Sequence, residues 1–596
     1  MSLFQHLPLT ASREIRVLVL QPGLNDSLIY CQLEHVRLDT NPTYEALSYV
    51  WGDDTLNKRI HVNNDLPLMI TTSLYNALRS LRHNNKEKRL WADGICINQN
   101  DKEEKVKQIA LFRDVYTQAS RVVTYIGENN ASTDRALDLA DQISEYIRRY
   151  KDDPDRPDMT AAIFEHGIDS LGFPAENDPI WEELRKVFRR EWSSRNWIVQ
   201  ESLLNPNMTM YCGRRNIAWN KLPNIIHYAK EGLTPPMALM SEAEYGTLAK
   251  SNFSNISTGQ NTHANLAALN HIRRDIITKG QEKTLLDLLE GCLRFDCKDK
   301  RDKVYSLLGV ASDKRDLNIV PNYNNNNTLQ NVYTEAAVRI IKVSGSLDIL
   351  SNVKPKKRVQ GLPSWVPDWS PVTGSPISGL LFGIKRSGNQ PYLASGNSTA
   401  SITNSHESIT LQARVLDTIV WRSATIKNIP EGKDQIMLQN WHSKVRASKQ
   451  YGGGRAANDA FWRILVANIT HDRKKAGADY EDYFAGWCEV EELQFTPNWP
   501  GGSDVDLKQI SFFQAALLSS LFWRRFCMTG ERYACLAPDG VQNGDFVCLL
   551  KGARTPFIIR EQSGQYVLVG EAYVHGLMHG EGLNIPGTNW ESIKIL

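Results

Sequence analysis

The sequence lacks several features that would place it in a common functional class. Its 596 residues contain no G-x-x-x-x-G-K-[ST] segment, so ATP-driven assembly by the chain itself is not expected. Lysine and arginine number 69 against 67 aspartates and glutamates, without a long basic block, and nucleic-acid binding is not indicated. The longest apolar stretches, such as Ala515 to Trp523, are too short to span a bilayer.

Cysteine spacing and the chain start exclude further classes. The nine cysteines are scattered and never spaced as C-x-x-C, which disfavours a disulfide framework and a zinc site. Residues 1–8 lack the build of a secretory signal. Glycines interrupt the histidine-containing stretch 571–581, which favours a packed turn over a metal site. We therefore expect a cytoplasmic protein with reduced thiols, no metal, no bound cofactor and no membrane segment.

What the sequence does contain is typical of a folded protein with several domains. Apolar residues make up 41% of the chain and charged residues 23%, far from the composition of disordered proteins. At this length two to four domains are expected. We predict an N-terminal extension (1–43), an α/β domain (44–205), a helical middle region (206–353) and a mixed, β-rich C-terminal region (354–596).

Residues 44–127 alternate between strand-like and helix-like segments, which indicates an α/β layer fold. Strands are predicted at 44–51, 89–97 and 121–127. Helices are predicted at 72–81 and after Asp101, which can cap the second one. Residues 59–62 and 66–70 flank a turn of asparagine and aspartate, which predicts a hairpin.

Three blocks carry the strongest functional signal: Tyr44-Glu-Ala-Leu-Ser-Tyr-Val-Trp-Gly-Asp53, Leu90-Trp-Ala-Asp-Gly-Ile-Cys-Ile-Asn-Gln99 and Arg195-Asn-Trp-Ile-Val-Gln-Glu201. In order and separation they resemble the fungal heterokaryon incompatibility (HET) domain, over roughly the first third of the chain. In the third block Asn196 departs from the family, which usually has an apolar residue there, so the local packing is in question. Segments 301–309, 362–369 and 570–576 also look like ones that accompany this domain.

The HET domain is in turn similar to TIR domains. The first block looks like their first-strand motif, and Trp197-x-x-x-Glu201 has the spacing of the motif that holds the catalytic glutamate of NAD-cleaving TIR enzymes. The resemblance implies a TIR-like, flavodoxin-like fold with a mostly parallel sheet, and NAD as a substrate. It also implies a cell-death effector in non-self recognition, which self-associates as a homo-oligomer through this domain and has a partner incompatibility protein.

The residue types fit such chemistry. Residues four apart share a helix face, so Trp197 and Glu201 can look into one pocket. Because NAD cleavage expels neutral nicotinamide, one glutamate can hold the ribose and stabilise the oxocarbenium-like charge. Ligands bind at strand ends of α/β sheets. The candidate nucleotide contacts are Ser48, Tyr49, Trp51, Gly52, Asp53, Asp93, Asn98 and Trp197, with Glu201 as the catalytic residue.

Each candidate also has a structural interpretation. A glutamate on a helix is commonly solvated or ion-paired, tryptophans commonly fill cores, and glycine, aspartate and asparagine commonly form turns. The second hypothesis is therefore a non-catalytic signalling and homotypic-interaction module. An open cleft at Glu201 lined by Ser48, Trp51 and Asp93 favours the enzyme. Burial of Glu201 in an ion pair with an arginine such as Arg195 or Arg190 favours the module.

Overall fold

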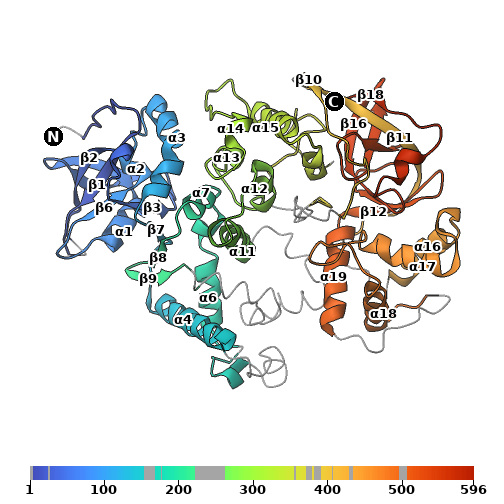
Figure 1. Cartoon of the computed structure of the whole chain (residues 1–596). Helices are drawn as coiled ribbons and strands as arrows, with labels where there is room; N and C mark the ends of the chain where they lie inside the picture. Colours follow the sequence, from blue (N-terminus) through green and yellow to red (C-terminus); the bar gives the residue numbers. More distant parts are fainter. Residues whose placement is uncertain are drawn as a thin grey trace. The chain divides into compact units, whose positions relative to one another are not determined.

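The structure is a computed structural model. It describes residues 4–24, 27–152, 168–175, 177–219, 221, 262–354, 358–370, 379–381, 391–405, 407–427, 434–495 and 507–596. The chain divides into two compact units, one of residues 1–246 and 259–327 and the other of residues 247–258 and 328–596 (Figure 1).

The first unit is built on a nine-stranded sheet with the order β5-β4-β2-β1-β6-β3-β7-β8-β9. Its strands are β1 (Glu14–Leu20), β2 (Tyr30–Arg37), β3 (Glu45–Tyr49), β4 (Leu56–Val62), β5 (Leu66–Thr71), β6 (Lys88–Trp91), β7 (Val122–Tyr125), β8 (Met208–Cys212) and β9 (Arg215–Ala218). The predicted hairpin is confirmed as β4 and β5. Strands β1 and β2, from the predicted N-terminal extension, lie inside this sheet.

The sheet is mixed, whereas the TIR resemblance implies a mostly parallel one. Strand β1 runs antiparallel to both of its neighbours, β2 and β6, and the hairpins β4–β5 and β8–β9 add two more antiparallel pairs. The run β6-β3-β7-β8 is parallel throughout, and β2 pairs with β4 in parallel over two residues. The carboxyl ends of β3, β6 and β7 therefore lie at one edge of the sheet, and two of the three sequence blocks end there.

The helices of the first unit are α1 (Thr72–Leu81), α2 (Asp93–Cys96), α3 (Lys102–Gln118), α4 (Ala131–Asp152), α6 (Ile180–Phe188), α7 (Ile198–Leu203), α11 (Thr262–Arg273), α12 (Leu285–Gly291), α13 (Asp302–Tyr305) and α14 (Lys314–Leu317). Thr71 caps α1 and Asp101 caps α3, which confirms both predicted helices. The predicted strand 89–97 stops at Trp91, because Asp93 and Gly94 begin α2.

The second unit contains a closed β-barrel. Its strands are β10 (Thr403–Asn404), β11 (Ile409–Arg422), β12 (Arg524–Thr529), β13 (Ala534–Pro538), β14 (Phe546–Leu550), β15 (Phe557–Gln562), β16 (Gln565–Glu571), β17 (Tyr573–Val574) and β18 (Glu591–Ile595). The order β14-β15-β16-β18-β11 closes because β11 also pairs with β14. The prediction of a β-rich C-terminal region is confirmed. A register shift between Val415 and Asp417 bends the long β11.

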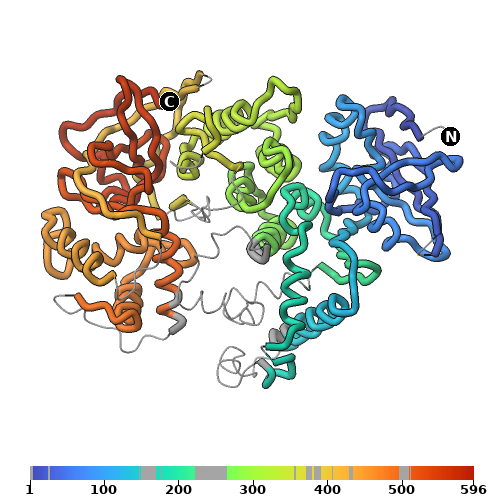
Figure 2. Tube along the Cα trace, turned by 180° about the vertical axis from the view of Figure 1, so that it is seen from behind, coloured from blue at the N-terminus to red at the C-terminus, as the bar shows by residue number. Residues whose placement is uncertain are grey.

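Helices complete the second unit: α15 (Leu329–Ser344), α16 (Gln435–Arg446), α17 (Gly454–Leu465), α18 (Tyr480–Val490) and α19 (Leu507–Leu521). Figure 2 shows α16 to α19 in orange beside the later barrel strands, β12 to β18, in red. Aromatic side chains dominate their shared core, among them Trp441, Phe461, Phe484 and Phe513. In the described residues no helix combines the length and the apolar character needed to cross a bilayer.

Candidate functional site

Parts of all three sequence blocks meet at the carboxyl edge of β3 and β6. Ser48 and Tyr49 end β3, and Asp93 follows β6 after one residue. Glu201 lies on the short helix α7, every residue of which is buried. Because β3 and β6 are parallel neighbours, their ends present these side chains together to α7.

Glu201 is held from two sides. One carboxylate oxygen accepts a hydrogen bond from the Ser48 hydroxyl, which itself accepts one from Trp192 Nε1 at 2.8 Å. The other carboxylate oxygen lies 3.8 Å from Arg195 Nη1, and that nitrogen donates to the carbonyl of Tyr49. The Glu201 side chain is only 6% exposed. The carboxylate is therefore a buried group with partners on both sides.

The electrostatics of Glu201 follow from this burial. Loss of water raises the pKa of the carboxyl above its usual value, and the nearby Asp93 raises it further. The Arg195 guanidinium and the Ser48 hydroxyl act in the opposite direction, because both favour the ionised form. Burial has the largest effect, so the pKa of Glu201 stays raised.

Asp93 holds the neighbouring part of the cluster. Its carboxylate accepts from Trp51 Nε1 at 2.9 Å and from the backbone of Gly94 at 2.8 Å. The buried Tyr49 hydroxyl approaches so closely that a Cβ atom on Gly94 would lie 2.5 Å from it. Burial and the adjacent Asp93 raise the pKa of Tyr49 well above its usual value, so the phenol stays neutral.

The remaining candidates do not join this cluster. Gly52 and Asp53 are exposed, and Asp53 accepts from both the backbone and the hydroxyl of Thr55, as in a local turn. Trp197 turns its indole N–H to Asp302 at 3.0 Å and packs edge-on against Phe112. The structure thus brings Ser48, Tyr49, Trp51 and Asp93 to Glu201.

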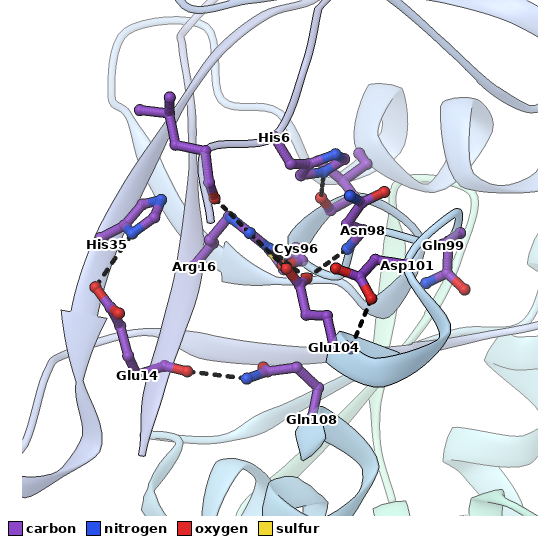
Figure 3. A network of polar contacts seen from close by, with 12 residues as sticks. His6, Glu14, Arg16, His35, Cys96, Asn98, Gln99, Asp101, Glu104 and Gln108 are labelled. Carbon is purple, nitrogen blue, oxygen red and sulfur yellow. Dashed lines mark hydrogen bonds and ion pairs between the residues drawn. The ribbon is translucent and has the colours of Figure 1, made fainter. Parts of the chain in front are cut away.

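Asn98 belongs to a second polar network, drawn in Figure 3. The backbone of Asn98 donates to Glu104 at 2.7 Å, and Glu104 also accepts two hydrogen bonds from Arg16 of β1, at 2.7 and 2.9 Å. Arg16 donates further to the carbonyls of Leu7 and Cys96. This network fastens the N-terminal segment and β1 to the start of α3.

Comparisons with known proteins agree with the resemblance in the sequence. The family model of the heterokaryon incompatibility protein (HET) matches residues 44–201. The model of the Het-6 beta-barrel domain matches residues 414–585, most of the closed barrel. These matches support a heterokaryon incompatibility protein. We call residues 44–201 the HET region.

A full-length relative supports the same conclusion. The chain is 26% identical over 675 aligned positions to the heterokaryon incompatibility protein 6, OR allele, of Neurospora crassa, an alignment that covers 96% of this chain and 94% of that protein. No solved structure matches the chain.

The environment of the HET region includes residues that sequence reasoning missed. Asp302 and Ser306 receive the side chain of Asn196, with Asn196 Nδ2 3.0 Å from the Asp302 carbonyl and 2.6 Å from Ser306 Oγ. Arg273 donates to backbone carbonyls just after α7, including that of Asn205 at 2.9 Å. Asn196 is therefore accommodated by polar partners from residues beyond the HET region. The block 301–309 was noticed in the sequence, but without a role.

The described residues contain no group of three or more histidine, cysteine, aspartate or glutamate side chains that could hold a metal ion. All nine cysteines are free. The chemical groups of the cluster around Glu201 are two carboxylates, one guanidinium, and hydroxyl and indole groups that donate hydrogen bonds.

Proposed function

We propose that this chain acts in heterokaryon incompatibility as a signalling module, in which the Glu201 cluster is a structural anchor of the HET region. One observation carries the proposal: the Glu201 carboxylate is buried between the Ser48 hydroxyl and the Arg195 guanidinium. A catalytic glutamate must reach its substrate, whereas an anchoring glutamate must be buried and partnered. In the module, homotypic contacts of the HET region pass on the signal.

The second candidate function is hydrolysis of the N-glycosidic bond of NAD by the self-associated protein. It is supported by the convergence of Ser48, Trp51 and Asp93 on Glu201 at the carboxyl edge of parallel strands, where ligands bind in α/β sheets. In this case assembly must move Arg195 aside and expose the carboxylate. The single copy would then be the inactive form of a TIR-like enzyme.

One experiment separates the two functions. The full chain, Glu201→Gln and the control Glu191→Gln are purified and concentrated on a clustering support, and NAD loss and nicotinamide release are followed. Glu191 is an exposed neighbour in the same segment. The signalling module predicts equal, background NAD loss in all three proteins, because the carboxylate does not reach the nucleotide.

The other outcome assigns the enzyme. NAD loss by the clustered wild type and by Glu191→Gln, with Glu201→Gln at background, would overturn the module. A removed transition-state carboxylate is expected to lower turnover by 100-fold or more, on the order of 3 kcal/mol. Circular dichroism of all three proteins checks that the comparison is made between folded chains.

A further inference from the structure

Asp302 lies outside the HET region and accepts hydrogen bonds from two of its side chains, Asn196 and Trp197. The Asp302 carboxylate accepts from Trp197 Nε1 at 3.0 Å on one oxygen and from the Tyr323 hydroxyl at 2.5 Å on the other. Its backbone carbonyl accepts from Asn196 Nδ2 at 3.0 Å and from Ser306 Oγ at 2.7 Å. Two consecutive residues of the third sequence block, Asn196 and Trp197, are thus fixed by one aspartate.

No basic side chain forms an ion pair with this carboxylate among the described residues. The adjacent Arg301 bonds to Asp299 at 2.7 Å and lies over the Tyr323 ring. The charged groups that act on Asp302 are Asp299, from the same loop, and Lys105 of α3. Burial dominates, and it raises the pKa of Asp302 to about 6 although Tyr323 and Trp197 donate to it.

Burying a carboxylate whose direct donors are all neutral costs free energy. In this structure the buried carboxylate of Asp302 holds Trp197 in place. The indole N–H is bonded to Asp302, and the ring packs on Phe112 of α3. The Trp197 carbonyl accepts from the Glu201 backbone N–H at 3.2 Å, at the first turn of α7. Fixing Trp197 therefore fixes the helix that carries Glu201.

We propose that Asp302 is a positioning residue of the HET region, which holds Trp197 and the start of α7 so that Glu201 stays against Ser48 and Arg195. The proposal rests on the proposed function only in treating Glu201 as the central residue of the site. It makes the block 301–309 a supporting part of the HET region, although the family model ends at residue 201.

The test is amide hydrogen exchange of the α7 peptide in the full chain, corrected for the intrinsic rate at each pH. Asp302→Ala leaves the Trp197 N–H and the Tyr323 hydroxyl without their acceptor, so we expect exchange at least tenfold faster at pH 7. Asp302→Asn keeps an acceptor for Trp197 and is expected to stay as slow as the wild type or slower. Asp316→Asn, an exposed aspartate of the neighbouring α14, is the control.

The pH profile gives a readout that a loss of packing would not change. The pKa of Asp302 is about 6 in the closed state and returns toward its ordinary 3.8 when α7 opens, so the closed state binds its proton more tightly. Protection of α7 should therefore fall as pH rises from about 4 to 6, by up to about 100-fold, and then level off. Asp302→Asn should remove the Asp302 part of this dependence and leave the part of the same sign from Glu201 on α7, whose pKa burial also raises, whereas Asp316→Asn should keep both parts.

Two results would overturn the proposal. One is unchanged α7 exchange in a folded Asp302→Ala variant, and the other is an Asp302→Asn variant with the wild-type pH profile. If Asp302→Ala does not fold, the Asp302→Asn profile alone decides. These readouts do not involve NAD, so the proposal and the proposed function can fail separately.

Discussion

Glu201 and Asp302 are both buried carboxylates, but their partners give them different electrostatics. Glu201 has a guanidinium at 3.8 Å, which partly offsets the cost of burying its charge. Within the described part of the chain, the Asp302 carboxylate is bonded to the indole of Trp197 and the hydroxyl of Tyr323, which are both neutral donors. The sequence indicated Glu201, because its spacing from Trp197 resembles a known motif. It gave no role to Asp302, whose partners come from segments far apart in the sequence.

Gly94 leads to a prediction at the scale of single residues. A Cβ at this position would lie 2.5 Å from the Tyr49 hydroxyl and 3.1 Å from a methyl group of Leu74. We expect Gly94→Ala to destabilise the first unit by about 1–3 kcal/mol, because overpacking moves Tyr49 away from Asp93. Hydrogen exchange of the β3 and α2 peptides during urea unfolding measures the change in this unit.

The matched control for Gly94→Ala is the same substitution in a Tyr49→Phe background. Removing the phenolic oxygen removes the nearest clash, so the alanine should cost less there than in the wild type. An equal cost in both backgrounds would show that the Tyr49 hydroxyl is not what requires a glycine.

At the scale of elements, local signals predicted some parts of the first sheet well. The asparagine-rich turn between residues 62 and 66 identified the β4–β5 hairpin, and Thr72-Ser73 with the apolar spacing after it identified α1, although the residue that caps this helix is Thr71. The end of β6 was missed. The predicted strand continued to residue 97, whereas Asp93 and Gly94 start the one-turn helix α2. The pairing of β1 with β6 had no local signal, since it joins residues about 70 positions apart in the sequence.

The polar network of Figure 3 leads to a prediction at this scale. Arg16 of β1 is 1% exposed and Glu104 of α3 is 9% exposed, so their ion pair at 2.7 Å is buried. Glu104→Gln leaves the guanidinium without its counter-charge, and we expect a loss of about 3–5 kcal/mol in the stability of the first unit. Urea unfolding followed by hydrogen exchange in β1 and α3 measures it.

Glu103 provides the control for this ion pair. It is an exposed glutamate on the same turn of α3, so Glu103→Gln should change stability by less than about 0.5 kcal/mol. The double variant Arg16→Met/Glu104→Met should recover part of the loss, since it buries no unpaired charge. Equal effects of Glu103→Gln and Glu104→Gln would show that the buried pair is not the strong link between β1 and α3.

At the scale of the whole molecule, the compact unit and the HET region have different limits. The HET region ends at residue 201, whereas the first unit includes residues 259–327. The sequence predicted a domain border at residue 205, a few residues after the last block ends at Glu201. Long-range contacts from Arg273 and Asp302 to the ends of α7 carry no such signature.

The limits of this unit can be tested by truncation. A chain of residues 1–327 keeps the sheet, α7 and all partners of α7 described here, and we expect it to fold as a soluble protein.

A chain of residues 1–219 keeps all nine strands of the sheet but lacks Arg273, Asp302 and Ser306. Without them Asn196 and Trp197 lose their buried hydrogen-bond partners and the carbonyls after α7 lose their cap. At about 1–3 kcal/mol for each buried group left unpaired, the loss approaches the stability of a typical domain. We therefore expect 1–219 to aggregate or to be cleaved rapidly in limited proteolysis, whereas equal protease resistance of the two chains would show that residues 262–327 are dispensable for the fold.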